Sequence, residues 1–439
     1  MFRAAFGSRP SRIELPDDVE DYQCFTDALL KPRDLGCEPI SSQLYNRECG
    51  LPGSYSYWSS SRLVPSTCIP PTLEFDSRVY NGQFSCTGDL YYCTSQGDIK
   101  IYDTSDPLDW SLLKTIDGIG IQWTITDADI SPCQKYIIYS TFNSNIFLAN
   151  ISPDSENVYQ TSSAQINEQI AINTSARNDY AVFSLKFSGE GNKVVVGTNG
   201  FSLEVVDLVK KKNICSVPNA HHDDVNTVCF ADREGSNVIF SGSDDTTVKI
   251  WDVRAMNGRD CQGVLIGHRE GVTHVSSKGD ELYLISNSKD QTLKLWDLRK
   301  CSSKHEYKAF SRTHHYQSGF DYRWNRYPME GYTKRLAADT SLLTFRGHHV
   351  LTTLIRCYFS PIFITGQRFI YTGDYNGQVY VYDAHTGKTV NVLRSLTHEQ
   401  MLTGETCSRD VSWHPFMPMI CATSFLNTIH TYTYDSEID

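Results

Sequence analysis

The chain has 439 residues, of which 40% are hydrophobic and 12% aromatic, so it is long and apolar enough to bury a large core. These proportions exclude an intrinsically disordered chain and a small domain held together by disulfides. With 40 basic and 51 acidic side chains the net charge is -11, and we therefore expect no direct nucleic-acid binding through a broadly basic surface. The 14 cysteines include no C-x-x-C pair, so we expect reduced thiols. The sequence contains no run of about 18 apolar residues and no apolar leader, so we expect neither a membrane span nor secretion.

Residues 1–60 differ in composition from the rest of the chain. An acidic stretch at 17–21 precedes Tyr22, Phe25 and Leu29, which share one face of a short helix, and prolines interrupt the sequence that follows. We expect an N-terminal extension that is partly disordered and carries a short helix able to dock on a partner.

One strand pattern recurs seven times in residues 61–439. In its clearest copies, Val248–Asp252 and Leu293–Asp297, apolar and polar residues alternate and a Trp-Asp pair closes the strand. The two tryptophans are 45 residues apart, a period typical of repeat proteins. Weaker copies lie at 99–103, 146–150, 203–207, 379–383 and 429–433.

A histidine precedes each of the two clearest copies, and an aspartate stands six residues before each tryptophan. These residues are His221, Asp245 and Trp251 in the first unit and His268, Asp290 and Trp296 in the second. The layout resembles the WD40 repeat, in which a unit of about 40 to 45 residues forms one four-stranded blade. The resemblance implies an all-β fold, a seven-bladed WD40 β-propeller with a short N-terminal extension. It also implies that the six residues form structural hydrogen-bonded networks inside the blades and are not catalytic.

The last blade lacks one strand. Only seven residues follow Tyr432, too few for the turn and fourth strand that a seventh blade requires. Residues 62–76 include an alternating segment at 72–75, which is typical of a strand. We predict that this segment pairs with the last blade and so removes both open edges of the ring.

Blade five contains an insertion. Trp296 and His348 are 52 residues apart, against 17 for the equivalent pair in blade four, so about 35 residues are extra. We place the insertion at 301–340, before a fourth strand near 342–345. Its basic and aromatic side chains suit either single-stranded nucleic acid or packing on the flank of the propeller, and the acidic chain favours packing. A second excess of residues, at 151–179, is rich in Ser, Asn and Gln and predicts a surface loop.

Catalytic and metal-binding motifs are scarce. The segment 221–224 holds two His and two Asp, but neighbours in an extended segment point to opposite sides and His221 already belongs to a blade. No Ser or Cys lies in a recognisable nucleophile motif, and no glycine-rich phosphate loop is complete. We therefore expect no catalytic residue, no metal and no cofactor, and a protein that is not an enzyme.

Both clear copies continue past the Trp-Asp pair to an arginine at the same offset. The residues are Asp252 and Arg254 in blade four and Asp297 and Arg299 in blade five. Each arginine follows a third strand, so we expect both guanidinium groups on one face of adjacent blades, where they can bind carboxylates or carbonyls of a partner. The pair resembles the box by which WD40 substrate receptors of the cullin-4 ubiquitin ligase bind the adaptor, damage-specific DNA-binding protein one. The resemblance implies adaptor binding by these four residues, although the second copy departs from the box at Asn287, where a small residue is usual.

Further segments resemble the WD-repeat protein 23 family of cullin-4-associated factors over residues 60–435. They are Tyr283–Thr292, Asp321–Trp324, Phe345–His348, Leu354–Cys357 and Arg409–Pro415. The resemblance implies a non-catalytic substrate receptor of a cullin-4 RING E3 ubiquitin ligase, which bridges the adaptor and a protein substrate. It also implies a nuclear and cytoplasmic protein whose substrate is a stress-response transcription factor, without direct contacts to nucleic acid or membrane. A WD40 scaffold in a different assembly is the alternative.

The resemblance is incomplete in blade seven, where Leu426 replaces a turn Asp and Thr433 a terminal Asp. No motif transfers the residues that contact substrate. Because the insertion at 301–340 emerges beside Arg299, we hypothesise that it contributes to the adaptor interface.

Overall fold

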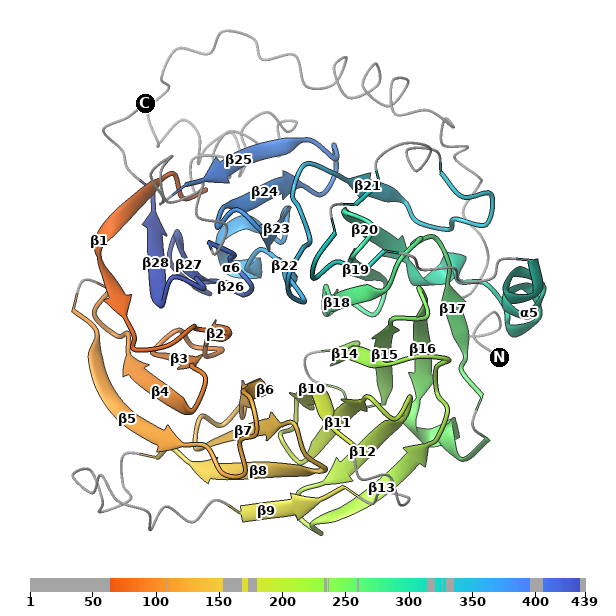
Figure 1. Ribbon diagram of the computed structural model, residues 1–439, viewed down its shortest axis with the longest axis horizontal. Helices are drawn as coiled ribbons and strands as arrows, with labels where there is room; N and C mark the ends of the chain where they lie inside the picture. Colours follow the sequence, from red (N-terminus) through yellow and green to blue (C-terminus); the bar gives the residue numbers. More distant parts are fainter. Residues whose placement is uncertain are drawn as a thin grey trace, which may run out of the picture.

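The computed structural model describes residues 64–434, apart from 108, 153–167, 173–179, 233–234, 236, 259, 314–319, 326, 329–334 and 395–405. In this part of the chain 28 strands form seven four-stranded antiparallel sheets, arranged as the blades of a ring (Figure 1). The predicted all-β, seven-bladed propeller is confirmed. The N-terminal extension with its expected helix lies outside the described residues.

Each blade runs in chain order from the central channel to the rim, except that blade seven takes its outer strand from the start of the described chain. Blade one consists of β2 (Asn81–Phe84), β3 (Leu90–Thr94), β4 (Asp98–Asp103) and β5 (Ser111–Asp117). Blade two consists of β6 (Ile125–Ile130), β7 (Tyr136–Thr141), β8 (Asn145–Asn150) and β9 (Glu168–Ala171). Blade three consists of β10 (Val182–Phe187), β11 (Lys193–Thr198), β12 (Leu203–Asp207) and β13 (Lys212–Val217). Blades four and five are β14 (Val225–Phe230), β15 (Val238–Ser243), β16 (Val248–Asp252), β17 (Gly263–Leu265); β18 (Val272–Ser277), β19 (Tyr283–Ser288), β20 (Thr292–Asp297) and β21 (Leu343–Phe345). Blades six and seven are β22 (Cys357–Phe359), β23 (Phe369–Gly373), β24 (Val379–Asp383), β25 (Thr389–Leu393); β26 (Val411–Trp413), β27 (Met419–Thr423), β28 (Thr428–Thr433) and β1 (Thr67–Glu74). Short helices follow β16 (η1, Val253–Gly258) and β20 (η2, Leu298–Lys300), lie in the insertion (α5, Lys304–Thr313) and separate β22 from β23 (α6, Ile362–Thr365).

The core lies between successive sheets. One buried cluster joins Val195 and Val205 of blade three to Val228, Ile239 and Trp251 of blade four. Because successive residues of a strand point to opposite faces, each middle strand supplies apolar side chains to both of its neighbours and reads as almost continuously apolar.

The predicted closure strand is present. β1 pairs antiparallel with β28, with Cys68 opposite Tyr432 and Leu73 opposite Ile429. The register shifts between Ile69 and Leu73, where two prolines lack the N–H that a regular ladder needs, as an edge strand tolerates.

The insertion of blade five ends as predicted, because β21 pairs with β20 and completes the sheet. The prediction of a surface loop across 151–179 is wrong for Glu168–Ala171, which form β9 and pair with β8. The strand was missed because the range is mainly polar and only one side chain of the four-residue strand, Ile170, is buried. Ile170 packs beside Ile146 and Val182. Residues 153–167 and 173–179 of that range lie outside the description.

Candidate functional site

The two strongest repeats contain closed hydrogen-bonded networks. In blade four His221 donates from Nδ1 to Asp245 (2.8 Å) and accepts at Nε2 from the Ser241 hydroxyl (2.7 Å), whose oxygen accepts from the Trp251 indole (2.8 Å). The equivalent distances in blade five are 3.1, 2.7 and 2.7 Å, for His268, Asp290, Ser286 and Trp296. All six predicted residues are therefore brought together in two sets, and their polar atoms face one another inside the blades.

The Asp-Arg pairs form a second set of hydrogen bonds, which is exposed and lies at the end of the third strand of each of these two blades. The Arg254 Nε and Nη2 atoms donate to the two oxygens of Asp252 at 3.0 and 2.8 Å, and the same bonds join Arg299 to Asp297 at 2.9 and 2.8 Å. Each aspartate also accepts the backbone N–H of its arginine at 3.0 Å. The arginine side chains are 71% and 46% exposed, whereas the aspartates are 15% and 7% exposed. The aspartates thus orient the guanidinium groups, and it is the arginines that a partner can reach.

Both arginines lie on the same face of the ring. Asp252 pairs with Val238 and Asp297 with Tyr283, which are equivalent positions in adjacent sheets. We call this the Arg face. The Arg299 Nη2 atom also donates to the Tyr283 hydroxyl at 3.4 Å, and the charge of Glu281 acts on Arg254, so the start of β19 lies beside Arg299 and the loop before it lies near Arg254.

Other blades share the aspartate without the exposed arginine. Asp103, Asp207 and Asp383 end third strands and accept backbone N–H groups of the turns that follow. In blade six Arg368 binds Asp383 from the loop before β23 at 2.9 Å, but its side chain is only 14% exposed. Within the described residues, the exposed guanidinium at this offset is therefore what distinguishes blades four and five.

The insertion begins on the Arg face but runs away from it along the rim of the ring. It starts there at η2, pairs through Ser302 with Val264 at the outer edge of blade four, and continues as α5 on the rim (Figure 1). Further along the insertion, the Tyr322 ring lies over Lys289, whose Nζ atom is 4.3 Å from the ring centre and which stands in the turn that precedes the third strand. That turn is at the opposite end of the blade from Arg299, so the segment around Tyr322 lies away from the Arg face. That the insertion contributes to the adaptor interface stays a hypothesis.

The insertion does pack on the propeller, in keeping with the favoured prediction. The Tyr307 ring of α5 lies 5.1 Å from Lys249 Nζ, and it stacks on His222 with ring centres 6.3 Å apart. On the far face Asp321 and Arg323 form the same bidentate pair as the Arg-face residues, at 2.9 and 3.0 Å, and Trp324 is 85% exposed.

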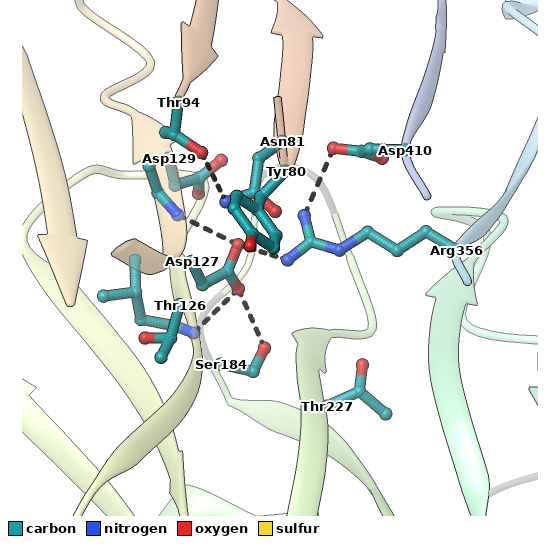
Figure 2. Close-up of polar contacts among 12 residues, drawn as sticks. Tyr80, Asn81, Thr94, Thr126, Asp127, Asp129, Ser184, Thr227, Arg356 and Asp410 are labelled. Atoms are coloured by element: carbon teal, nitrogen blue, oxygen red, sulfur yellow. Dashed lines mark hydrogen bonds and ion pairs between the residues drawn. The ribbon is translucent and has the colours of Figure 1, made fainter. Parts of the chain in front are cut away.

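A buried ionic network crosses the central channel (Figure 2). Arg356, just before β22, donates to Asp127 of β6 at 2.7 Å and to Asp410, just before β26, at 3.3 Å. Asp127 also accepts from the Ser184 hydroxyl at 3.0 Å (Figure 2). The network therefore ties blades two, three, six and seven together.

The protonation states of the channel follow from this pairing. Burial is the largest influence and would raise the pKa of Asp127, but the charges of Arg356 and Lys186, together with hydrogen bonds to the carboxylate, outweigh it and hold that pKa well below its usual value. Burial, followed by the repulsion of Arg356, lowers the pKa of Arg409 to about 10, and Arg409 donates to the carbonyl of Tyr80 at 2.9 Å. Because Arg356 is paired with both Asp127 and Asp410, these buried charges hold the blades in place.

Sequence reasoning missed the channel network. Its signal is the pair of aspartates in the inner strand β6, Asp127 and Asp129, where a strand facing a dry core would carry apolar residues. The described residues contain no group of three or more His, Cys, Asp or Glu side chains that could hold a metal ion. No helix in the described ranges is long and apolar enough to cross a membrane.

Comparisons with known proteins agree with this architecture. The family model for the WD domain, G-beta repeat, matches residues 212–252 and 259–297. The chain is 40% identical over 407 residues to the LEC14B protein of Lithospermum erythrorhizon, and the match covers 90% of this chain and 83% of that protein. It is also 40% identical over 316 residues to a Caenorhabditis elegans protein named DDB1- and CUL4-associated factor 11 homolog. That match covers 71% of this chain and 52% of the nematode protein, about half of its length.

Proposed function

Because the chain belongs to the WD40-repeat family that contains LEC14B and the DDB1- and CUL4-associated factor 11 homologs, we propose that it is a substrate receptor of a cullin-4 RING ubiquitin ligase. In this role it is not an enzyme. It bridges the adaptor DDB1 and a protein substrate, and ubiquitin transfer is accelerated because the substrate is held close to catalytic groups of other subunits.

The observation that carries the proposal is the pair of exposed, aspartate-held guanidinium groups of Arg254 and Arg299. Each fork is fixed by two hydrogen bonds, so little side-chain freedom is lost when it binds. Such a fork can still donate its remaining N–H groups to carbonyls or carboxylates of the adaptor. Two forks on adjacent blades fix both the position and the direction of the docking subunit.

The test is to replace both arginines. In Arg254→Ala with Arg299→Ala, adaptor binding should weaken well over tenfold, because removing one partner of a desolvated charged contact costs about 2 to 5 kcal/mol. The measurement is co-purification, followed by titration calorimetry with purified DDB1. The matched control is Arg323→Ala, which removes an arginine with the same aspartate pairing from the far face and should leave the affinity unchanged.

Undiminished capture by the double variant, with an unchanged melting temperature, would contradict the proposal. A folded wild-type chain that does not bind DDB1 would favour the alternative, a scaffold in a different assembly. We further propose, from the family resemblance, that the substrate is a stress-response transcription factor, that no nucleic acid is bound directly, and that the protein acts in nucleus and cytoplasm. Affinity purification with and without the two arginine changes, read by mass spectrometry, identifies the substrate.

A further inference from the structure

The Arg face also carries exposed apolar side chains, on blades six and seven. Ile362 and Phe363 of α6 are 48% and 71% exposed, and Phe416, between β26 and β27, is 52% exposed. The two phenylalanine rings stack with centres 5.0 Å apart. We call these three residues the aromatic patch. Large apolar side chains that lie together in water are a feature of interaction surfaces.

The patch is presented by fixed turns. The Nδ1 atom of His414 accepts the backbone N–H groups of Phe416 (3.1 Å) and Met417 (3.0 Å), while Nε2 donates to the Gly88 carbonyl (3.2 Å). α6 ends at Thr365 and is followed by the capping residue Gly366, whose φ of 62° suits glycine. Phe363 and Phe416 therefore stack on each other from two turns whose backbones are fixed by hydrogen bonds, so the fold itself keeps the two rings exposed.

The patch lies on the same face as the arginines. α6 is in the loop before β23, and β23 begins at Phe369, which pairs with Asp383 at the end of the third strand. Phe416 is in the equivalent loop of blade seven, before Met419, which pairs with Thr433. Tyr283 of blade five occupies the matching position beside Asp297.

A series of contacts leads from the loop just after α6 to Arg299. Just after α6, the Gln367 amide donates to the Lys278 carbonyl at 2.7 Å, and the Lys278 ammonium lies 4.9 Å from the centre of the Tyr283 ring. The Tyr283 hydroxyl accepts from Arg299 at 3.4 Å. Arg254, Arg299 and the aromatic patch are thus parts of one surface that extends over blades four to seven.

We propose that the aromatic patch is a second contact for the adaptor subunit that binds Arg254 and Arg299, and that it covers an apolar region of that subunit. This inference rests on the proposed function. Exposed ion pairs alone contribute little to binding, and a stable interface buries about 1,200 to 2,000 Å² with an apolar centre and a polar rim. The arginines supply the polar part, and the stacked phenylalanines supply the apolar part.

Two other occupants fit the surface less well. A substrate must be bound together with the adaptor, so it needs a surface that the adaptor leaves open. A second copy of the chain would bring two molecules of net charge -11 face to face, which opposes association.

The test is Phe363→Ser with Phe416→Ser in the full chain, titrated with purified DDB1. We expect at least a tenfold loss of affinity with an unchanged melting temperature, because both side chains are exposed in the free protein. Trp324→Ser is the matched control, since it removes an aromatic side chain that is 85% exposed on the far face, and it should bind DDB1 as the wild type does. If folding of the double variant is impaired, Phe363→Ser alone replaces it, and hydrogen exchange of the unaltered chain should show protection at 361–368 and 414–418 in the complex.

The outcomes separate the two proposals. If the double arginine variant loses DDB1 while the double phenylalanine variant keeps it and neither segment is protected, the aromatic patch is not an adaptor contact and the proposed function stands. If neither double variant loses DDB1, or the wild type does not bind it, both proposals fail. If the wild type sediments as a dimer that Phe363→Ser dissociates, the patch joins two copies of the chain and the inference is overturned.

Discussion

Blades four and five each contain a complete hydrogen-bonded network within one repeat, whereas, in the described residues, blades six and seven lack that network and use residues from other parts of the chain. In blade five His268, Asp290, Ser286 and Trp296 form a network within one repeat. In blade six His348 accepts at Nδ1 from the Tyr382 hydroxyl (2.9 Å) and donates from Nε2 to Asn287 of the preceding blade (2.9 Å).

Blade seven goes further, because its outer strand β1 comes from the start of the described chain, and its Asp410 carboxylate accepts from Gly82 of blade one and from Arg356 beside blade six. The difference shows that a complete repeat motif marks a blade that is stable through local contacts, and that a degraded motif is compensated by contacts between blades. The four predictions below test this comparison.

Deletion of residues 62–76 should have the largest effect. Without β1, β28 becomes an open edge with unpaired N–H and C=O groups, and we expect aggregation and a loss of cooperative unfolding. Sedimentation and thermal unfolding measure the outcome. A soluble monomer with the wild-type melting temperature would refute closure by β1.

Arg356→Met should come next. The change leaves Asp127 and Asp410 without their buried partner, and we expect the free energy of unfolding to fall by about 3 to 5 kcal/mol in urea titrations. Arg254→Met is the control, because an exposed arginine should change stability by no more than about 0.5 kcal/mol. Equal effects of the two changes would show that the channel network does not hold the blades together.

Acid should weaken blades five to seven, since burial, followed by the repulsion of Arg356, also holds the pKa of His274 in β18 well below its usual value. Burial lowers the pKa of His348 and of His430 to about 4, below the usual value of 6.5, so both are neutral in the folded protein. The unfolded chain then binds more protons, and this stability, complete above pH 6.5, is lost as the pH falls towards 4. Two such histidines reduce the free energy of unfolding by about 3 kcal/mol between pH 7.5 and 5.5.

Hydrogen exchange can locate this acid effect. We expect faster exchange at pH 5.5 in β23 and β27 than in β15, because the carboxylate of Asp245 opposes the lowering of the His221 pKa by burial, whereas His348 binds a phenol and an amide. Stability that does not change between pH 7.5 and 5.5 would contradict this account.

Asn287→Gly should have the smallest effect. The change restores the small residue usual in the motif, but it removes the acceptor of His348 and a donor to the Ile355 carbonyl, and we expect a loss of about 1 to 2 kcal/mol. The reverse change in blade four, Gly242→Asn, should also destabilise, because a Cβ atom there would meet Val272 at 2.7 Å. A stabilising effect of Asn287→Gly would mean that the contact between blades five and six is dispensable.

The ring could be predicted from the sequence because its signals are local. The Trp-Asp strands and their 45-residue period sufficed to count the blades. The seven residues after Tyr432 are too few for another strand, and this led us to expect a closing strand upstream. The contacts that join distant residues could not be predicted in this way. Arg356 and Asp127 are 229 positions apart, and no spacing rule relates them.

The candidate site shows the same division. The offset of Arg254 and Arg299 from their Trp-Asp pairs placed both on one face, since equivalent strands end alike. The aromatic patch and the path of the insertion depend on how loops of different blades meet. Phe363 and Phe416 are 53 positions apart and touch only because blades six and seven are neighbours.

The pairing of β1 with β28 also has a consequence for biosynthesis. Thr67 and Thr433 are partners separated by 366 positions, so β1, the first strand of the described residues to leave the ribosome, must wait for β28. At about 5 to 20 residues per second this delay is on the order of 20 to 70 s, during which six blades can assemble while one strand has no partner. We expect a nascent-chain chaperone to shield that strand until translation ends.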